Sequence, residues 1–288
     1  MTHMIQLDNV HVALKGFDLT IDELRIPKGF TVGCIGRNGA GKSTLIRTMM
    51  GLTVPARGDV LWDGAPLDVA MKERIGFVYD DLYYPKEFKV KALRRLFRSV
   101  YPTWNDSLYT ELLESYGVSE KKKIKQLSKG MKMKTQIALA LAHDPDVLIM
   151  DEPTAGLDPV VRRQFVAMLR DWMDAREDRT LFFSTHITSD LERFADYILL
   201  IDDGRVKFFL PIDEVEERFV LVRGTTNTLS ERDQAMFEGV EWRGSQFTGL
   251  IDRSTHPIAD DWIVERASLE DILYFLTEVT HDEARIID

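Results

Sequence analysis

The sequence predicts an α/β fold in which helices cover a largely parallel sheet. Short apolar runs alternate along most of the chain with longer stretches whose apolar residues recur at helical spacing. A glycine-rich loop at 36–44 joins one apolar run to a helical stretch, and two adjacent acids, Asp151 and Glu152, end another run. Glycine-rich and acidic segments at the carboxyl ends of buried strands are typical of α/β proteins that bind ligands there.

Composition limits the classes of protein that are possible. A chain of 288 residues with 44 % hydrophobic residues permits one large α/β domain and a small appendage. The formal net charge of −10 disfavours a general affinity for nucleic acid, so no nucleic-acid partner is expected. The single cysteine, Cys34, lies in an apolar run and indicates a reducing compartment. No leader and no apolar run of about 20 residues is found, so we expect a protein that is soluble on its own.

The apolar pattern predicts the elements in order. Buried strands are predicted at 31–35, 75–79, 147–150, 180–184 and 197–201. Helices are predicted at 43–50 and at 161–172, and the stretch 85–126 is predicted to be helical throughout, as an insertion. After a turn at Gly204 come a charged helix at 213–218, strands at 219–222, 240–242 and 262–264, and a closing helix at 268–280 that Ser268 and Asp271 cap.

We therefore expect two unequal domains. The first covers residues 1–219 and carries the glycine-rich loop, with a helical subdomain at about 85–133. The second, at 220–288, is a small α+β accessory domain.

The loop at 36–44 fits the phosphate-binding pattern G-x-x-x-x-G-K-[ST] in its strand–loop–helix context. Its glycines let successive backbone N–H groups point into one concavity, and the following helix adds its positive dipole end. Lys42 would neutralise the β- and γ-phosphates of a triphosphate, and the Ser43 hydroxyl would be a ligand of Mg²⁺. The candidate binding residues are Gly36, Asn38, Gly39, Gly41, Lys42, Ser43 and Thr44.

The acids at the end of the 147–150 strand have different predicted roles. Asp151 is placed to hold Mg²⁺, and Glu152 lies one residue nearer to an attacking water, which it can orient and deprotonate. Alone, such a pair is equally compatible with a solvated turn. The segments LSKGM at 127–131 and AGLD at 155–158 and the residue His186 accompany it, however.

With these motifs in this order, the chain resembles the ATP-binding subunits of ABC transporters over roughly residues 4 to 220. The family has a P-loop ATPase fold with a mostly parallel core, an antiparallel β subdomain and a helical subdomain. The resemblance implies a head-to-tail dimer, either a homodimer or a heterodimer with a related subunit. ATP would lie between the phosphate loop of one subunit and Ser128 and Gly130 of the other.

The resemblance also assigns the remaining roles. Glu152 would be the general base, His186 would contact the γ-phosphate, and Asp158 would link the two sites across the dimer. The membrane pathway would belong to a separate polytopic permease subunit. This chain would then be cytoplasmic and peripheral on the inner face of the cell membrane.

Several positions depart from the family pattern. The signature usually reads LSGGQ, and here Lys129 and Met131 stand in it. Asp80 aligns with the glutamine of the Q-loop; it can still reach Mg²⁺ but cannot donate an amide hydrogen bond, which predicts altered coupling to the partner. Leu14 occupies the expected place of the adenine-stacking aromatic, and Phe17, the nearest candidate, is favoured as a core residue of the first hairpin.

The segments YYP at 83–85 and YPTWN at 101–105, with LSKGM and Asp80, are similar to a subgroup of bacterial exporters for bacitracin-type antibiotics and peptide toxins. An amphipathic peptide or lipophilic antibiotic is the expected cargo. The alternatives are a soluble ABC-type clamp and a nucleotide-gated sensor; the single phosphate loop disfavours the first, and Glu152 with His186 disfavours the second.

Two groups of basic residues are compatible with a solvated helix surface or with a surface for a partner or anionic lipid headgroups. One group is Lys121, Lys122, Lys123, Lys125, Lys129, Lys132 and Lys134, and the other is Lys91, Arg94, Arg95 and Arg98.

Overall fold

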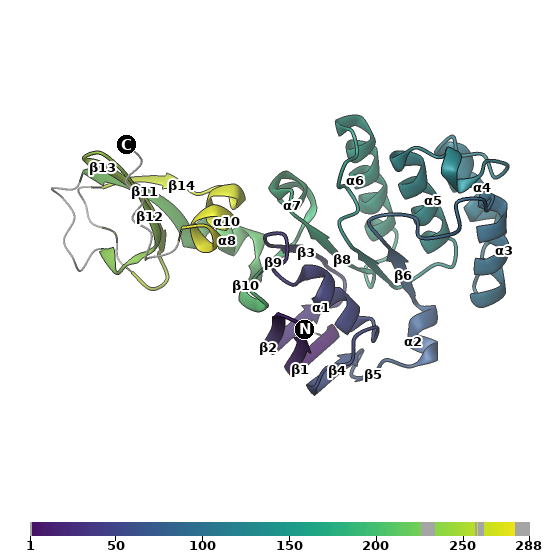
Figure 1. The fold of residues 1–288 in the computed structure, drawn as a ribbon, viewed down its shortest axis with the longest axis horizontal. Helices are drawn as coiled ribbons and strands as arrows, with labels where there is room; N and C mark the ends of the chain where they lie inside the picture. The colour runs from purple at the N-terminus through teal and green to yellow at the C-terminus, as the bar shows by residue number, and fades with distance from the viewer. Residues whose placement is uncertain (1, 226–233, 257, 259–261, 280–288) are drawn as a thin grey trace.

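The computed structural model describes residues 2–225, 234–256, 258 and 262–279 (Figure 1). The molecule is elongated. A group of helices, α3 to α5, lies at one end of its longest axis, and a second, smaller sheet lies at the other end.

A ten-stranded sheet forms the larger part, in the order β5-β4-β1-β2-β10-β9-β3-β8-β7-β6. Its parallel strands are β3 (Thr31–Ile35), β6 (Ile75–Val78), β7 (Val147–Met150), β8 (Thr180–Thr185) and β9 (Tyr197–Asp202). The remaining strands are β1 (His3–Leu14), β2 (Phe17–Pro27), β4 (Arg57–Trp62), β5 (Ala65–Pro66) and β10 (Arg205–Pro211). They pair antiparallel, except that β10 pairs with β2 in parallel. The predicted α/β class and the five predicted parallel strands are confirmed.

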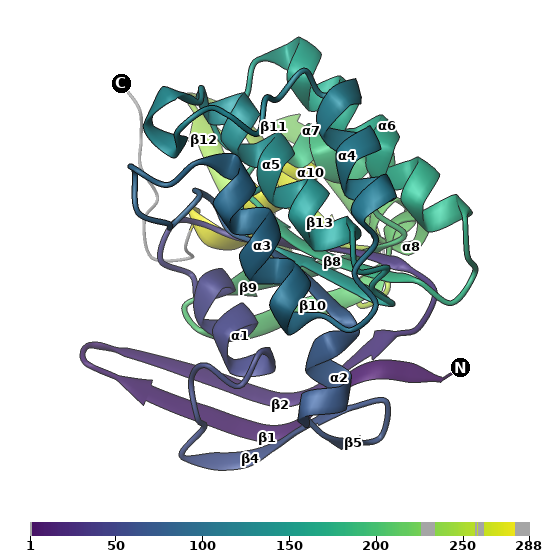
Figure 2. The same cartoon turned by 90° about the vertical axis from the view of Figure 1, so that its right-hand side faces the viewer.

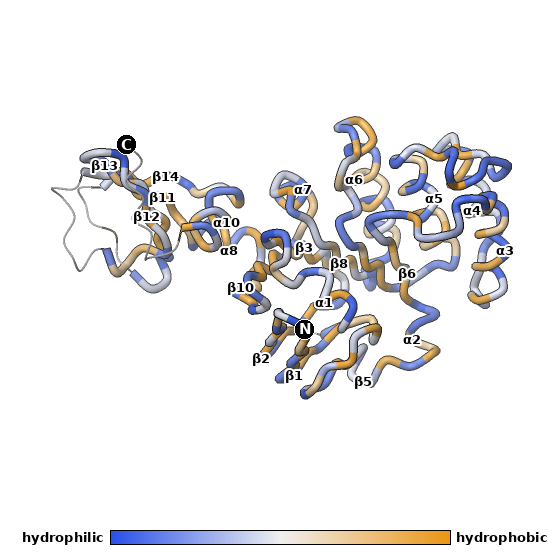
Figure 3. Tube along the Cα trace, in the orientation of Figure 1, coloured by the Kyte–Doolittle hydropathy of each residue, from blue (hydrophilic) through white to orange (hydrophobic). Residues whose placement is uncertain are grey.

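Helices cover both faces of the parallel strands. α1 (Lys42–Met49) packs between these strands and the β1–β2 hairpin (Figure 2). The opposite face is covered by α5 (Lys129–Leu141), α6 (Pro159–Asp174) and α7 (Thr188–Phe194). Alternate residues of β7 contact the two layers: Leu148 and Met150 pack toward α5 and α6, and Val147 and Ile149 pack toward α1. This two-sided burial explains why the strand is a continuous apolar run, as the hydropathy in Figure 3 shows for the central strands.

The insertion is only partly helical, so the prediction of helix throughout 85–126 is wrong. It contains α3 (Val90–Val100), α4 (Asp106–Ser115) and the short helix η1 (Ile124–Gln126). The segments just before α3 and just before η1 instead lie side by side, with an antiparallel bridge between Lys89 and Lys123. The helical spacing of Leu93, Leu96 and Phe97 was extended to these flanking segments, whose conformation is instead determined by backbone hydrogen bonds between them.

The C-terminal part has its own four-stranded sheet, in the order β12-β13-β11-β14. After α8 (Ile212–Arg218) come β11 (Phe219–Thr225), β12 (Phe237–Arg243), β13 (Gln246–Asp252), β14 (Ile263–Arg266) and α10 (Leu269–Thr277). The predicted cap of the closing helix is confirmed, because Ser268 and Asp271 form a reciprocal capping box. The helix ends at Thr277, and Thr280 lies outside the described residues.

Beyond the first hairpin, the strands that the apolar pattern did not predict are β4, β5, β10 and β13. β10 carries Lys207 between partly buried residues and lacks a simple alternation of apolar and polar residues. β13 contains Gly249, and a Cβ there would lie 2.3 Å from Cδ1 of Phe237. Glycine lowers the apparent strand propensity of this segment, yet the packing of Phe237 requires it.

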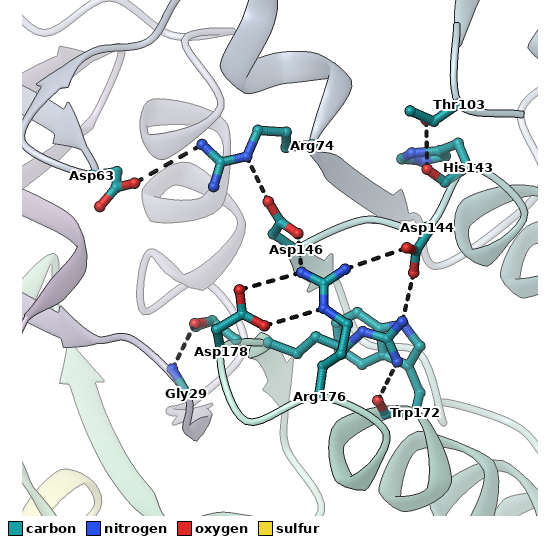
Figure 4. Close-up of polar contacts among 12 residues, drawn as sticks. Gly29, Asp63, Arg74, Thr103, His143, Asp144, Asp146, Trp172, Arg176 and Asp178 are labelled. Atoms are coloured by element: carbon teal, nitrogen blue, oxygen red, sulfur yellow. Dashed lines mark hydrogen bonds and ion pairs between the residues drawn. The ribbon is translucent and has the colours of Figure 1, made fainter.

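A network of ion pairs joins the loops at the amino edge of the parallel strands (Figure 4). The Asp146 carboxylate accepts from Arg74 Nε at 2.5 Å and also from Arg176, and its side chain is only 16 % exposed. Arg176 also pairs with Asp144 and Asp178. The arginines hold the pKa of Asp146 below its usual range against the opposing effect of its burial.

Asp146→Asn is expected to lower the free energy of unfolding by about 1–2 kcal/mol, because two partly buried arginines lose their shared anion. Urea denaturation at pH 7 measures the effect. Glu111→Gln, an exposed position on α4, is the matched control and is expected to change stability by less than about 0.5 kcal/mol. Equal effects of the two substitutions would contradict the prediction.

Candidate active site

The phosphate loop joins β3 to α1, as its motif predicts. Gly39 and Gly41 have φ of 85° and 112°, in the left-handed region that favours glycine. A Cβ at Gly41 would also lie 2.8 Å from Cζ of Phe17, so this glycine is needed for both conformation and space. α1 begins at Lys42, directly after the loop, and its N-terminus faces the cavity described below.

Lys42 is folded over the loop. Its ammonium donates to the carbonyls of Gly36, at 2.7 Å, and Arg37, at 3.1 Å, and it lies 3.4 Å from Glu152 Oε1. The side chain is only 6 % exposed. A cation with little access to water is therefore fixed beside the loop and beside one of the predicted acids, where it can attract an anionic ligand.

Ser184, at the end of β8, organises the two acids. Its hydroxyl donates to Asp151 Oδ1 at 2.7 Å, and its oxygen accepts from the N–H of Glu152 at 2.9 Å. Glu152 has φ of 48°, a conformation that costs free energy for a residue with a side chain. Sequence reasoning missed Ser184; the available signal was its place at the end of the predicted strand that follows the acids.

His186 follows two residues after Ser184 and lies against the predicted base. Its Nδ1 is 2.6 Å from Glu152 Oε2. Glu152 is thus contacted by an imidazole on one oxygen and by the ammonium of Lys42 on the other. Such an arrangement fixes the orientation of a carboxylate that can accept a proton.

A cavity of about 530 Å³ opens over this group. Among the predicted residues it is lined by Asn38, Gly39, Gly41, Lys42, Ser43, Thr44, Asp80, Glu152 and His186. Leu14, Lys15, Phe17, Arg37, Lys129 and Ala155 line it as well. Gly36 and Asp151 contribute to the loop and to the acid pair without lining the cavity.

Of the positions that depart from the family pattern, Leu14, Asp80 and Lys129 line the cavity and Met131 does not. Asp80 is exposed and accepts a hydrogen bond from the Tyr83 hydroxyl at 2.9 Å. Phe17 begins β2, is partly buried against the core around α1, and also lines the cavity, so both of its expected roles remain compatible with its place. Leu14 is 47 % exposed beside it.

Ser128, Gly130 and Asp158 do not line the cavity of their own chain. Ser128 caps α5, and its hydroxyl accepts from the N–H of Met131. The nearest atom to a Cβ built at Gly130 would be 3.5 Å away, so the single chain gives no steric reason for glycine there. Asp158 caps α6 by accepting from the N–H groups of Val160 and Val161.

Arg37 connects the phosphate loop to the C-terminal part, a contact that sequence reasoning missed. Its Nη1 donates to the carbonyl of Thr277, the last residue of α10, at 2.9 Å. Its Nε lies 2.7 Å from Glu278 Oε1. Since Arg37 also lines the cavity, the end of α10 and the nucleotide-binding loop share one side chain.

Arg37→Ala is expected to loosen the last turn of α10, because a cation at a helix C-terminus contributes about 0.3–1 kcal/mol. Amide hydrogen exchange in residues 274–278 should become roughly two- to fivefold faster. Arg57→Ala, an exposed position on β4, serves as the control. Unchanged exchange in Arg37→Ala would show that the contact does not hold the helix end.

The fold and this site define the class of protein as a P-loop ATPase of the ABC type. A family model described as ABC transporter matches residues 19–155. The nickel import ATP-binding protein NikO of Rhodobacter capsulatus is 33 % identical over 241 residues, covering 77 % of this chain and 95 % of that protein. The chain belongs to the ATP-binding proteins of ABC transporters and is an ABC-type ATPase.

Other relatives differ in what their names say they transport. YtrB of Bacillus subtilis, an ABC transporter ATP-binding protein, is 28 % identical over 257 residues, covering 87 % of each chain. The bacitracin transport ATP-binding protein BcrA of Bacillus licheniformis is 31 % identical over 210 residues, covering 70 % of this chain and 68 % of that protein. Relatives thus include proteins named for import and for antibiotic transport.

A solved structure titled as the ATP binding subunit of an ABC transporter matches with a TM-score of 0.67 at 25 % identity, covering 74 % of this chain and 92 % of that chain. The predicted ABC ATPase fold is therefore confirmed. Among the helices of the described residues, none is long and apolar enough to cross a bilayer.

Proposed function

We propose that this chain is the ATP-hydrolysing subunit of an ABC exporter and that it drives a separate polytopic permease from the inner face of the membrane. The observation that carries the hydrolytic part is the convergence of Lys42, Glu152 and His186 at one cavity, with 2.6 Å between the histidine and the carboxylate. A site that only bound nucleotide would not need an oriented carboxylate beside the phosphate loop.

In this proposal Glu152 accepts the proton of the water that attacks the γ-phosphate. Ser184 holds the backbone of Glu152, and His186 holds its side chain and faces the γ-phosphate. Lys42 and the N–H groups at the start of α1 stabilise the charge on the β- and γ-phosphate oxygens.

The residues present suit Mg²⁺. Ser43 offers a hydroxyl and Asp151 a carboxylate fixed by Ser184, both hard oxygen donors. Among the described residues, no three His, Cys, Asp or Glu side chains are grouped to hold a metal alone. That arrangement fits an ion whose coordination nucleotide phosphates and water complete, and Asp80 at the rim is a further oxygen donor. When bound, Mg²⁺ would neutralise phosphate charge.

Ser128 and Gly130 of the signature do not line the cavity of their own chain, although Lys129 between them does, and this supports a head-to-tail dimer. Ser128 is exposed at the N-terminus of α5, and the single chain does not require glycine at 130, since a Cβ there would be in ordinary van der Waals contact, 3.5 Å from Val161. Such a surface can approach the nucleotide on a second subunit closely, and Asp158, which caps α6, would link the two sites. The partner would be a second copy or a related ATPase.

The export direction and the cargo, an amphipathic peptide or lipophilic antibiotic, are proposed from the sequence of the insertion and from the relatives. The YYP and YPTWN segments of the insertion resemble those of antibiotic exporters, and BcrA carries bacitracin transport in its name. The alternatives are a soluble ABC-type clamp and a sensor with little hydrolysis.

Affinity purification of the tagged chain from gently solubilised membranes tests the proposal. A stoichiometric polytopic membrane protein among the co-purifying proteins is expected, and its transport assay then decides the direction and cargo. Reproducible absence of such a protein, with the chain found on ribosomes or free, would favour the soluble clamp.

Asp80→Gln is expected to change how the permease stimulates ATP hydrolysis by about fivefold or more, since it replaces an anion at the cavity rim by an amide donor. The ratio of ATPase rates with and without the reconstituted permease measures this. Tyr83→Phe is the control, because it removes the hydrogen bond to Asp80 and keeps the charge. Unchanged ATPase and transport in Asp80→Gln would contradict altered coupling at this position.

A further inference from the structure

Two lysine-rich segments, one from each end of the helical insertion, lie side by side. The N–H of Lys125 donates to the carbonyl of Lys86, the N–H of Ile124 to that of Phe88, and the N–H of Val90 to that of Lys122. The bridge between Lys89 and Lys123 completes the antiparallel pairing. The backbone therefore brings residues 86–91 and 120–125, which are far apart in the sequence, into one ribbon, here called the lysine ribbon.

Most of the ribbon's charge is not neutralised. Its carboxylates are Glu87, which contacts Lys123 at 2.7 Å and Lys125 at 2.6 Å, and Glu120, which pairs with Arg94. Within the part of the chain that the structure describes, no ion pair is found for five exposed lysines of the ribbon. These are Lys86, Lys89, Lys91, Lys121 and Lys122.

The ribbon lies in the one strongly basic region of an acidic protein. Between residues 86 and 134 there are thirteen Lys and Arg against five Asp and Glu, whereas the whole chain has a net charge of −10. The insertion is also the end of the molecule farthest from the second sheet (Figure 1). Such a charge distribution favours an orientation in which this end faces an anionic surface.

We propose that the lysine ribbon docks on anionic phospholipid headgroups of the membrane in which the permease lies. The proposal rests on the proposed function only in that a permease would bring the chain to a membrane. Lysine ammonium groups act as hydrated point charges and suit a diffuse layer of headgroups, each one near the surface adding to the attraction.

A hydrophobic side chain accompanies the charges. Phe88, in the middle of the first segment, is 45 % exposed although its backbone is paired. An aromatic ring flanked by lysines suits the boundary between headgroups and acyl chains. Nucleic acid is a less suitable partner, because the ribbon contains no arginine and the remainder of the chain is acidic.

Flotation of the purified full-length chain with vesicles tests the proposal without a permease. Binding is expected to vesicles with about 30 % phosphatidylglycerol and not to pure phosphatidylcholine, and it should weaken steeply as NaCl is raised from about 50 to 300 mM. The triple substitution Lys86→Gln, Lys89→Gln and Lys122→Gln should lower the apparent affinity at least about tenfold. Phe88→Ser should lower it several-fold with little change in salt dependence.

The triple substitution Lys28→Gln, Lys72→Gln and Lys207→Gln changes the net charge equally at other places and should lower binding less than about twofold. Equal losses in the two triple variants, or no binding to anionic vesicles at low salt, would overturn the proposal. Tighter binding to a 20-nucleotide RNA than to the vesicles would assign the ribbon to nucleic acid instead. Capture of a permease from membranes is a separate measurement, so a failure of the proposed function would be distinguishable from a failure here.

Discussion

Glu152→Gln is expected to lower the rate of ATP hydrolysis by about 100- to 1,000-fold while ATP still binds. The amide keeps the size of the side chain and can still contact His186 and Lys42, but it cannot accept a proton from water. Phosphate release in the steady state measures the hydrolysis rate, and titration with a fluorescent ATP analogue measures binding. Loss of a negative charge 3.4 Å from Lys42 should also strengthen ATP binding.

Two further variants separate catalysis from structure. Ser184→Ala removes the hydrogen bonds to Asp151 and to the backbone of Glu152, so a smaller loss of about tenfold is expected. Glu177→Gln, an exposed acid in the loop after α6, should leave the rate unchanged. A very low wild-type rate that Glu152→Gln did not alter would support the nucleotide-gated sensor.

The parts of the site that the sequence predicted are those that local geometry determines. The glycines, the lysine and the helix of the phosphate loop are adjacent in the chain, so a short sequence pattern describes the whole phosphate-binding loop. The acids at the end of β7 are equally local. The residue that holds these acids in place is not local in sequence. Ser184 reaches them only because β8 lies beside β7 in parallel register, with Met150 opposite Phe183.

The same distinction explains what was missed in the fold. Strands with two buried faces are continuous apolar runs and were predicted, whereas β10 and β13 depend on their neighbours for their conformation. The contact of Arg37 with the end of α10 joins residues 240 positions apart, and no local pattern signals it. The lysine ribbon likewise depends on pairing between segments that looked helical when each was considered alone.

Acid is expected to destabilise the protein through His143, which follows α5 and is only 1 % exposed. Its ring stacks on Tyr101 with 3.9 Å between ring centroids, and its carbonyl accepts from the Thr103 hydroxyl at 2.6 Å. Burial lowers the pKa of His143 from 6.5 to about 4, against the weaker opposing effect of the Glu73 backbone. The imidazole therefore stays neutral in the folded protein under conditions in which it is protonated in the unfolded chain.

The sign follows from proton binding. Between pH 6.5 and about 4 the unfolded state binds more protons at this histidine than the folded state, so stability falls as pH falls through this window. The full loss is about 3 kcal/mol, of which about 2 kcal/mol should occur between pH 7 and pH 5. Urea denaturation at these two pH values measures the difference. His143→Phe keeps a ring against Tyr101 and should reduce the pH dependence by that amount, whereas His3→Gln, at the start of β1, should not. If His143→Phe unfolded with the same pH dependence as the wild type, the buried imidazole of His143 would not be the cause of the acid sensitivity, and another titratable group would have to account for it.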